Sequence, residues 1–228
     1  MKRFMKVVPL LLITILCFSS VTHAATTTYS LVSCSGGDYG LKGNFKLPTL
    51  VSAWDSGTNK YNKINFELWL PVNGSTGDWL ELGYKHGNKA DGTTNTAFYN
   101  GFFKSKQVNG VYGYGSLNKA FSVGTTYTVT IVDVNKQGLW EIYIGQTYFG
   151  SFADTVAPST SSFTNDYGYE VTRQSGTQST TSTTITNMNY YDGSWKSISG
   201  KYPSPYNTST IVTASYNSST NTATFTKK

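Results

Sequence analysis

The clearest pattern in the chain is Ile64-Asn65-Phe66-Glu67-Leu68-Trp69-Leu70, in which apolar side chains recur at every second position until a proline follows. A period of two is typical of a β-strand with one face on a core. The phenylalanine and the two leucines would then face the core, and Glu67 and Trp69 would lie on the opposite face. We therefore predict a strand that presents a carboxylate and an indole on its outer side.

A second segment, Trp79-Leu80-Glu81-Leu82, follows a turn that begins at Asn73-Gly74 and shows the same alternation. Its two leucines are typical of a core, which leaves Trp79 and Glu81 on the outer face. The outer face of a curved sheet is often a binding groove. We expect the two tryptophans and the two glutamates of these segments to share one such surface.

No stretch of helical period follows residue 24, and short segments rich in β-branched and aromatic residues alternate with Gly, Asn, Asp and Ser. Tyr127–Val132 and Leu139–Ile144 flank the turn Asn135–Gly138 as a predicted hairpin, and Ile185–Tyr191 is a predicted late strand. Turn signals every 8–12 residues favour an all-β fold, an antiparallel β-sandwich of the jelly-roll or concanavalin-like type, in a single domain.

Residues 1–24 are predicted to be a secretory signal peptide, because a basic start precedes an apolar run, Val7–Phe18, that is too short to span a membrane comfortably. Small residues then lead to a cleavage site after Ala24. A lipoprotein signal through Cys17 is less favoured, since Leu16 stands where a small residue is needed. We expect a secreted, extracellular protein.

Residues 25–200 are then predicted to form the sandwich domain. Residues 201–228 are predicted to form a C-terminal β-hairpin extension packed on the same domain, with Thr210–Tyr216 and Thr222–Thr226 as its strands. The Pro-containing segment Lys201–Asn207 is the best candidate for the connection.

Charge and composition exclude several function classes. The formal net charge of +6 includes three basic residues of the signal, and the remainder shows no run of Lys or Arg, so we expect no nucleic-acid partner. We also expect no membrane association after signal cleavage, and a monomer. Cys34 would be the only mature cysteine, so no internal disulfide can form.

Histidine and aspartate offer little for catalysis or metal binding. His86 would be the only mature histidine, predicted in a surface turn, which disfavours Ser-His-Asp catalysis and a histidine-based zinc site. The aspartates considered as metal ligands are scattered in turn-like contexts: Asp55, Asp78, Asp91, Asp133 and Asp154. We expect no cofactor and no metal, with a calcium ion among the loops as the alternative.

Glutamate is rare, and the chain contains only four. Glu81 and Glu170 lie inside predicted strands near a glycine, in Leu80–Tyr84 and Gly168–Val171. A strand carboxylate is costly to bury without a partner, so the two could form one site built from distant segments. The alternative is an exposed glutamate that pairs with a neighbouring side chain, with Arg173 as a possible partner of Glu170.

Two facing carboxyl groups suit two kinds of hydrolysis. Peptide hydrolysis would use one carboxylate to deprotonate a water while the other, kept neutral, donates a proton. Glycoside hydrolysis needs two carboxyls about 5–10 Å apart. No Glu-x-Asp-x-x-Glu run is present, although a site made by two strands stays open.

Several segments in order along residues 38–192 carry a family resemblance: Asp38–Leu50, Ile64–Leu70, Leu80–Tyr84, Gly138–Gly150, Gly168–Val171 and Ile185–Asp192. They resemble the neprosin family, secreted glutamic peptidases with a β-sandwich catalytic domain. Leu80–Tyr84 is similar to "IEAGW" and Gly168–Val171 to "GGEV", which implies Glu81 and Glu170 as catalytic residues. The chain departs from the family at Phe98–Phe102, which lacks the family's cysteines.

The chain also resembles small secreted Bacillus proteins of unknown function, of the YrpD type. We predict a secreted glutamic-peptidase-like hydrolase with a two-glutamate water-activating site and with Trp69, Trp79, Tyr99 and Tyr169 as substrate-binding residues. Packing in the core or at an edge is the alternative fate of these aromatics. The alternative function is a non-catalytic carbohydrate- or cell-wall-binding sandwich. The partner would be an extracellular peptide or polysaccharide.

Overall fold

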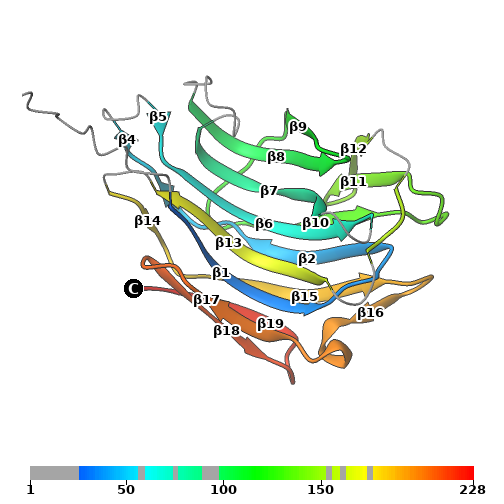
Figure 1. Cartoon of the computed structure of the whole chain (residues 1–228). Coiled ribbons are helices and arrows are strands. Elements are labelled where there is room, and N and C mark those ends of the chain that lie inside the picture. Colours follow the sequence, from blue (N-terminus) through cyan, green and yellow to red (C-terminus); the bar gives the residue numbers. More distant parts are fainter. Residues whose placement is uncertain are drawn as a thin grey trace, which may run out of the picture.

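A computed structural model describes residues 26–55, 60–73, 77–88, 98–152, 156–159, 163–173 and 177–228. The predicted signal peptide, Asp91 and Asp154 lie outside these residues. The described chain is an all-β sandwich, as predicted, in which two large antiparallel sheets face each other (Figure 1). None of the described residues forms a helix long and apolar enough to cross a membrane.

The seven-stranded sheet carries the predicted groove face. Its strand order is β17-β1-β13-β6-β7-β8-β9. The bounds in that order are Ser204–Asn207, Thr26–Ser35, Thr164–Arg173, Lys63–Val72, Asp78–Asn88, Phe98–Val108 and Val111–Ser116.

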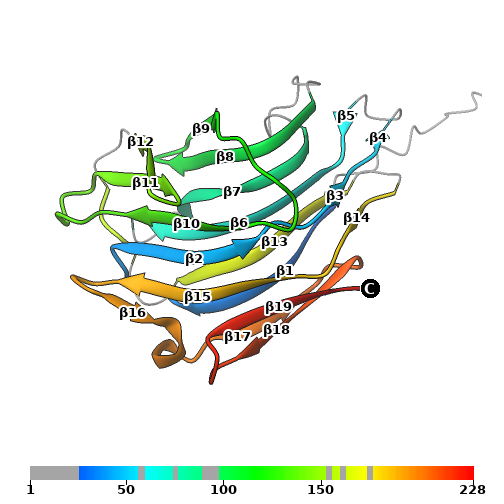
Figure 2. The ribbon, with the colours of Figure 1, turned by 180° about the vertical axis from the view of Figure 1, so that it is seen from behind.

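The eight-stranded sheet covers the other side of the core and lies in front in Figure 2. Its main order is β12-β11-β10-β2-β15-β19-β18, and β16 pairs with β15. The bounds in that order, with β16 last, are Thr147–Phe152, Trp140–Ile144, Thr126–Val132, Gly40–Lys46, Thr183–Tyr191, Thr222–Lys227, Val212–Asn217 and Trp195–Ser197.

Short elements complete the described chain. Two small pairs join β3 to β14 and β4 to β5, and a 3-10 helix, η1, precedes β17. Their bounds are Leu50–Val51, Ser179–Thr180, Trp54–Asp55, Lys60–Tyr61 and Ile198–Lys201.

The alternating pattern of residues 64–70 forms part of strand β6, and its apolar side chains face the core as predicted. Phe66, Leu68 and Leu70 are fully buried between the sheets, where the Phe66 ring meets Phe45 of β2 edge to face at 4.9 Å. Burying these side chains is worth roughly 2 kcal/mol each in apolar area alone. The inward face therefore anchors β6, and the alternate residues are held rigidly on the outward face.

The C-terminal residues join both sheets. The predicted hairpin is β18–β19, and β19 pairs with β15 inside the eight-stranded sheet. Strand β17 pairs with β1 and so forms one edge of the seven-stranded sheet. This edge lies next to the groove face, which makes residues 201–207 available to a site there.

His86 is not in a surface turn, contrary to the sequence prediction. It lies within β7, half-buried, where its Nδ1 shares a 2.8 Å hydrogen bond with the Ser52 hydroxyl and its ring packs on Phe98. Burial lowers the pKa of the imidazole. Gly87 and Asn88 are residue types typical of turns, and for that reason a turn was predicted here. In the structure both residues pair with β8, so β7 continues through them.

Candidate active site

Three glutamates meet on the outward face of the seven-stranded sheet. Glu67 lies on the central strand β6, with Glu81 on β7 and Glu170 on β13 at its two sides. One carboxylate oxygen from each lies within 4.8 Å of the others. The sequence predicted that Glu81 and Glu170 could form one site and placed Glu67 on the same face. It did not identify Glu67 as the residue between them.

Two glycines flank the central glutamate in the sheet. In the strand register, Glu67 lies opposite Gly83 on one side and Gly168 on the other. A Cβ at Gly83 would lie 2.6 Å from the Glu67 Cβ. Gly168 has a φ of +147°, and a Cβ there would lie 2.3 Å from the Ser30 carbonyl oxygen. Gly83 therefore makes room for Glu67, whereas Gly168 makes room for the backbone of β1.

The three carboxylates have different surroundings. Glu170 accepts hydrogen bonds from Asn65 Nδ2 at 3.2 Å and Thr172 Oγ1 at 3.4 Å, and its Oε1 lies 3.1 Å from Lys63 Nζ. Glu81 accepts a short hydrogen bond from the Ser105 hydroxyl. Lys63 is thus a cation beside Glu170, and the side chain of Arg173, the possible partner considered from the sequence, lies outside the described residues.

Glu67 is the least compensated of the three. Its side chain is only 4% exposed, and among the described residues its Oε2 has no hydrogen-bond partner. Burial raises the pKa of Glu67 well above its usual value, and the charges of Glu81 and Glu170 raise it further. Lys63 and Lys85 offset part of this rise. The arrangement favours a neutral carboxylic acid at position 67.

Lys85 is a second cation on this face that sequence reasoning missed. It is fully buried on β7, with its Nζ 5.1 Å from the Phe103 ring centre and 4.7 Å from that of Tyr114. Lys85 lies four residues after Glu81 in β7, and side chains at every second position of a strand point to the same face. This alternation was the signal in the sequence that could have placed Lys85 beside the glutamates.

A cleft of about 190 Å³ opens over the three carboxylates. The residues lining it are Tyr29, Leu31, Glu67, Trp69, Trp79, Glu81, Asp166 and Glu170. Trp69 and Trp79, two of the predicted substrate-binding residues, are therefore at the site. Their rings meet edge to face at 6.2 Å, and Tyr112 meets Trp79 in the same manner. The cleft has room for a few waters beside the acids.

The other two predicted substrate-binding residues do not line this cleft. Tyr169 is fully buried between the sheets, where it stacks on Phe66 at 4.7 Å. As the neighbour of Glu170 in a strand, it must point to the opposite face. Tyr99 donates a hydrogen bond to the Phe102 carbonyl and packs on Tyr114 at the start of β8. Neither tyrosine therefore contributes to the wall of this cleft.

The same oxygens could also hold a cation, since carboxylates are the ligands that Ca²⁺ uses in proteins. Lys63, in contact with Glu170, and Lys85 supply positive charge close to this position. Those charges weaken the attraction for a metal ion and favour a proton as the compensating species. The geometry fits acid–base chemistry better than metal binding.

No family model matches the chain, and no curated protein matches it either.

Proposed function

We propose that this chain is a secreted glutamic-peptidase-like hydrolase whose water-activating residues are Glu81 and Glu170, with Glu67 as the proton-holding acid between them. The observation that supports the proposal most strongly is the convergence of three carboxylates from three adjacent strands within 4.8 Å in one cleft. Structural carboxylates gain nothing from this arrangement, because like charges at such distances repel.

The surroundings suggest a role for each acid. Both oxygens of Glu170 already accept from donors, among them the Lys63 ammonium, so neither oxygen is free to take up a water. We assign the general base to Glu81. It would take a proton from a water as the water oxygen attacks the peptide carbonyl carbon.

Glu67 would complete the reaction as the acid. Its neutral carboxyl would donate first a hydrogen bond to the developing oxyanion and then its proton to the leaving nitrogen as the C–N bond breaks. The proton held on Glu81 would restore the starting state by passing to Glu67. This cycle requires Glu67 to be protonated, so activity should fall as pH rises through its raised pKa.

The test is hydrolysis of denatured casein from pH 3 to pH 8 by wild type, Glu81→Gln and Glu170→Gln. Each substitution should lower the rate at acid pH, and Glu81→Gln should lower it by at least about 100-fold, the usual scale for losing a general base. The melting temperature should change little. Glu141→Gln is the matched control, because Glu141 is the one glutamate outside the cluster and pairs with Tyr143 on the other sheet. Unfolding of both site variants, or full activity in both, would contradict the proposal.

A second candidate is a carbohydrate- or wall-binding sandwich, which the tryptophans in the cleft favour. It predicts retention on a polysaccharide column, loss of retention in Trp69→Ala or Trp79→Ala, and normal retention in Glu81→Gln. The edge-to-face packing of the two rings offers no flat platform for a sugar, and for this reason we place it second.

A further inference from the structure

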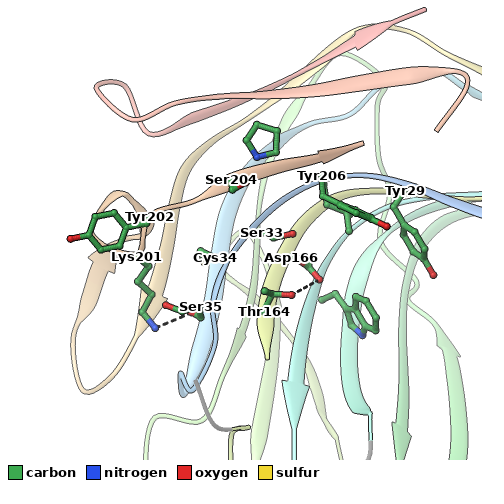
Figure 3. A pocket seen from close by; sticks show the side chains of 13 residues that line it. Tyr29, Ser33, Cys34, Ser35, Thr164, Asp166, Lys201, Tyr202, Ser204 and Tyr206 are labelled. Atoms are coloured by element: carbon green, nitrogen blue, oxygen red, sulfur yellow. Dashed lines mark hydrogen bonds between the residues drawn. The ribbon is translucent and has the colours of Figure 1, made fainter. Parts of the chain in front are cut away.

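A larger cavity adjoins the glutamate cleft. It has a volume of about 810 Å³ and lies between β1, β13 and the segment from η1 to β17 (Figure 3). It shares Tyr29, Leu31, Trp69 and Asp166 with the cleft over the three acids. A chain lying across the acids could therefore place a neighbouring side chain in this cavity.

Asp166 is the polar residue at the junction of the two spaces. Its side chain is only 4% exposed, and the Thr164 hydroxyl donates to its Oδ2 at 3.5 Å. Its Oδ1 is buried and has no hydrogen-bond partner in the described part of the chain. A buried carboxylate oxygen without a donor is costly, and a ligand that supplies a donor or a positive charge would recover that cost.

The walls suit a long side chain with an apolar stem. Apolar and aromatic groups contribute most of the lining, including Tyr29, Leu31, Trp69, Pro205 and Tyr206. Tyr206 and Tyr29 lie on the same side of the cavity as Asp166 in Figure 3. Lysine and arginine pack their methylene stems on such surfaces, and aromatic faces attract their charged ends.

The charges around the junction also favour a cation. Four acids lie here: Glu67, Glu81, Glu170 and Asp166. Lys201 lines the far side of the cavity, but its ammonium is held by both Asp38 oxygens at 2.5 and 2.6 Å and by two backbone carbonyls, so its charge is matched. Burial raises the pKa of Asp166 to about 6. Above that pH, the other acids of the junction outnumber Lys63 and Lys85, the cations beside the glutamates in the described part of the chain, even with Glu67 neutral.

We propose that this cavity is the subsite for a lysine or arginine side chain of the peptide substrate, with Asp166 as the residue that determines this specificity. The proposal rests on the proposed peptidase function, since it names the residue that the substrate presents beside the bond to be cut. An apolar side chain would leave Asp166 Oδ1 without a donor, and an acidic one would be repelled.

The kinetic test uses paired fluorogenic peptides that differ at one position, lysine against norleucine, which has nearly the same shape without the charge. Wild type should prefer lysine by at least 10-fold in kcat/KM. Asp166→Asn should bring the ratio close to one. The control is Asp192→Asn, an exposed acid that pairs with Lys196. Equal use of both peptides by wild type would overturn the subsite and leave the peptidase proposal standing.

A binding test keeps the two proposals distinguishable if no peptide is cut. The probe is benzamidine, an aromatic cation, against neutral benzamide, with the melting temperature of Glu81→Gln protein at pH 7 as the readout. Benzamidine alone should raise the melting temperature, and Asp166→Asn should abolish the rise. An equal effect of both probes, or no effect of either, would overturn the subsite whatever the peptidase assay shows.

Discussion

Two groups of buried acids in this molecule differ in how their charge is compensated. Asp38, 3% exposed before β2, contacts Lys201 with both oxygens and accepts from Asn165 Nδ2 at 2.5 Å. Glu67 is equally buried, yet its Oε2 has no partner in the residues that the structure describes, and two further glutamates lie beside it. Asp38 links the segment before β2 to Lys201 of η1, whereas Glu67 lines a cleft.

The difference separates an acid that is paired within the fold from one that, under the proposed function, holds a proton for catalysis. Burial raises the pKa of Asp38, but its hydrogen bond and ion pair with Lys201 offset part of the rise. For Glu67 the neighbouring acids add to the effect of burial. Carboxyl groups with perturbed pKa values are found more often at functional sites than elsewhere, and this tendency supports the proposed function.

The largest expected effect is on catalysis. Glu67→Gln should lower the rate of casein hydrolysis at pH 4 by about 100- to 1000-fold, because the amide cannot deliver a proton. Asp38→Ser, measured on protein shown to be folded, should retain a rate within a few-fold of wild type. Equal losses in the two variants would mean that Glu67 has no special part in the reaction.

The unfolding free energy should show the opposite order, with a large loss at Asp38 and none at Glu67. Asp38→Asn leaves the Lys201 ammonium, which is mostly buried, without its anion, and should destabilise the fold by about 3 kcal/mol. Glu67→Gln at pH 7 removes a group that resists ionisation and should be neutral or stabilising by about 1 kcal/mol. Urea unfolding of both variants at pH 7 checks the contrast. A large loss of stability in Glu67→Gln would show that the glutamate is structural.

A subtler effect is the pH dependence of stability. Since the folded pKa of Glu67 is raised, its contribution is fully present below the ordinary glutamate value and is lost as pH rises through the folded pKa. The unfolding free energy of wild type should therefore decline more steeply above pH 4.5 than that of Glu67→Gln. Urea midpoints from pH 4 to pH 8 give the slopes, and parallel curves would contradict the raised pKa.

The smallest effect should come from an exposed acid. Asp192 pairs with Lys196 at 2.8 Å on the surface, where solvent screens the interaction. Asp192→Asn should leave the melting temperature and the rate of hydrolysis unchanged within error. A measurable change in the melting temperature would show that exposed ion pairs also affect stability here. The effects of the buried acids could then not be attributed to their burial.

Local patterns in the sequence predicted the sandwich and the face of the site. The alternation of residues 64–70 placed Glu67 and Trp69 correctly because a strand has only two faces. The same rule, applied to Glu170, would have sent Tyr169 into the core. Which strands are neighbours could not be predicted, since β13 enters the sheet between β1 and β6 from a distant part of the chain.

The partners of the glutamates depend on that strand order. Lys63 reaches Glu170 only because β6 and β13 are adjacent, and no spacing along the chain indicates it. Glu67 was identifiable as the third acid only once Gly83 and Gly168 were known to flank it. Sequence reasoning therefore found the acids and missed the arrangement that sets their protonation.

The most direct test of the account is the protonation state of Glu67 itself. Infrared difference spectra at pH 5 between wild type and Glu67→Gln should show the loss of a C=O band from a neutral carboxyl. The control is Asp192→Asn, because the hydrogen bond from Lys196 lowers the pKa of Asp192, and its difference from wild type should show only the loss of carboxylate bands. A carboxylate signal in the Glu67 difference at that pH would mean that the cluster stores no proton, and the proposed acid–base mechanism would be wrong.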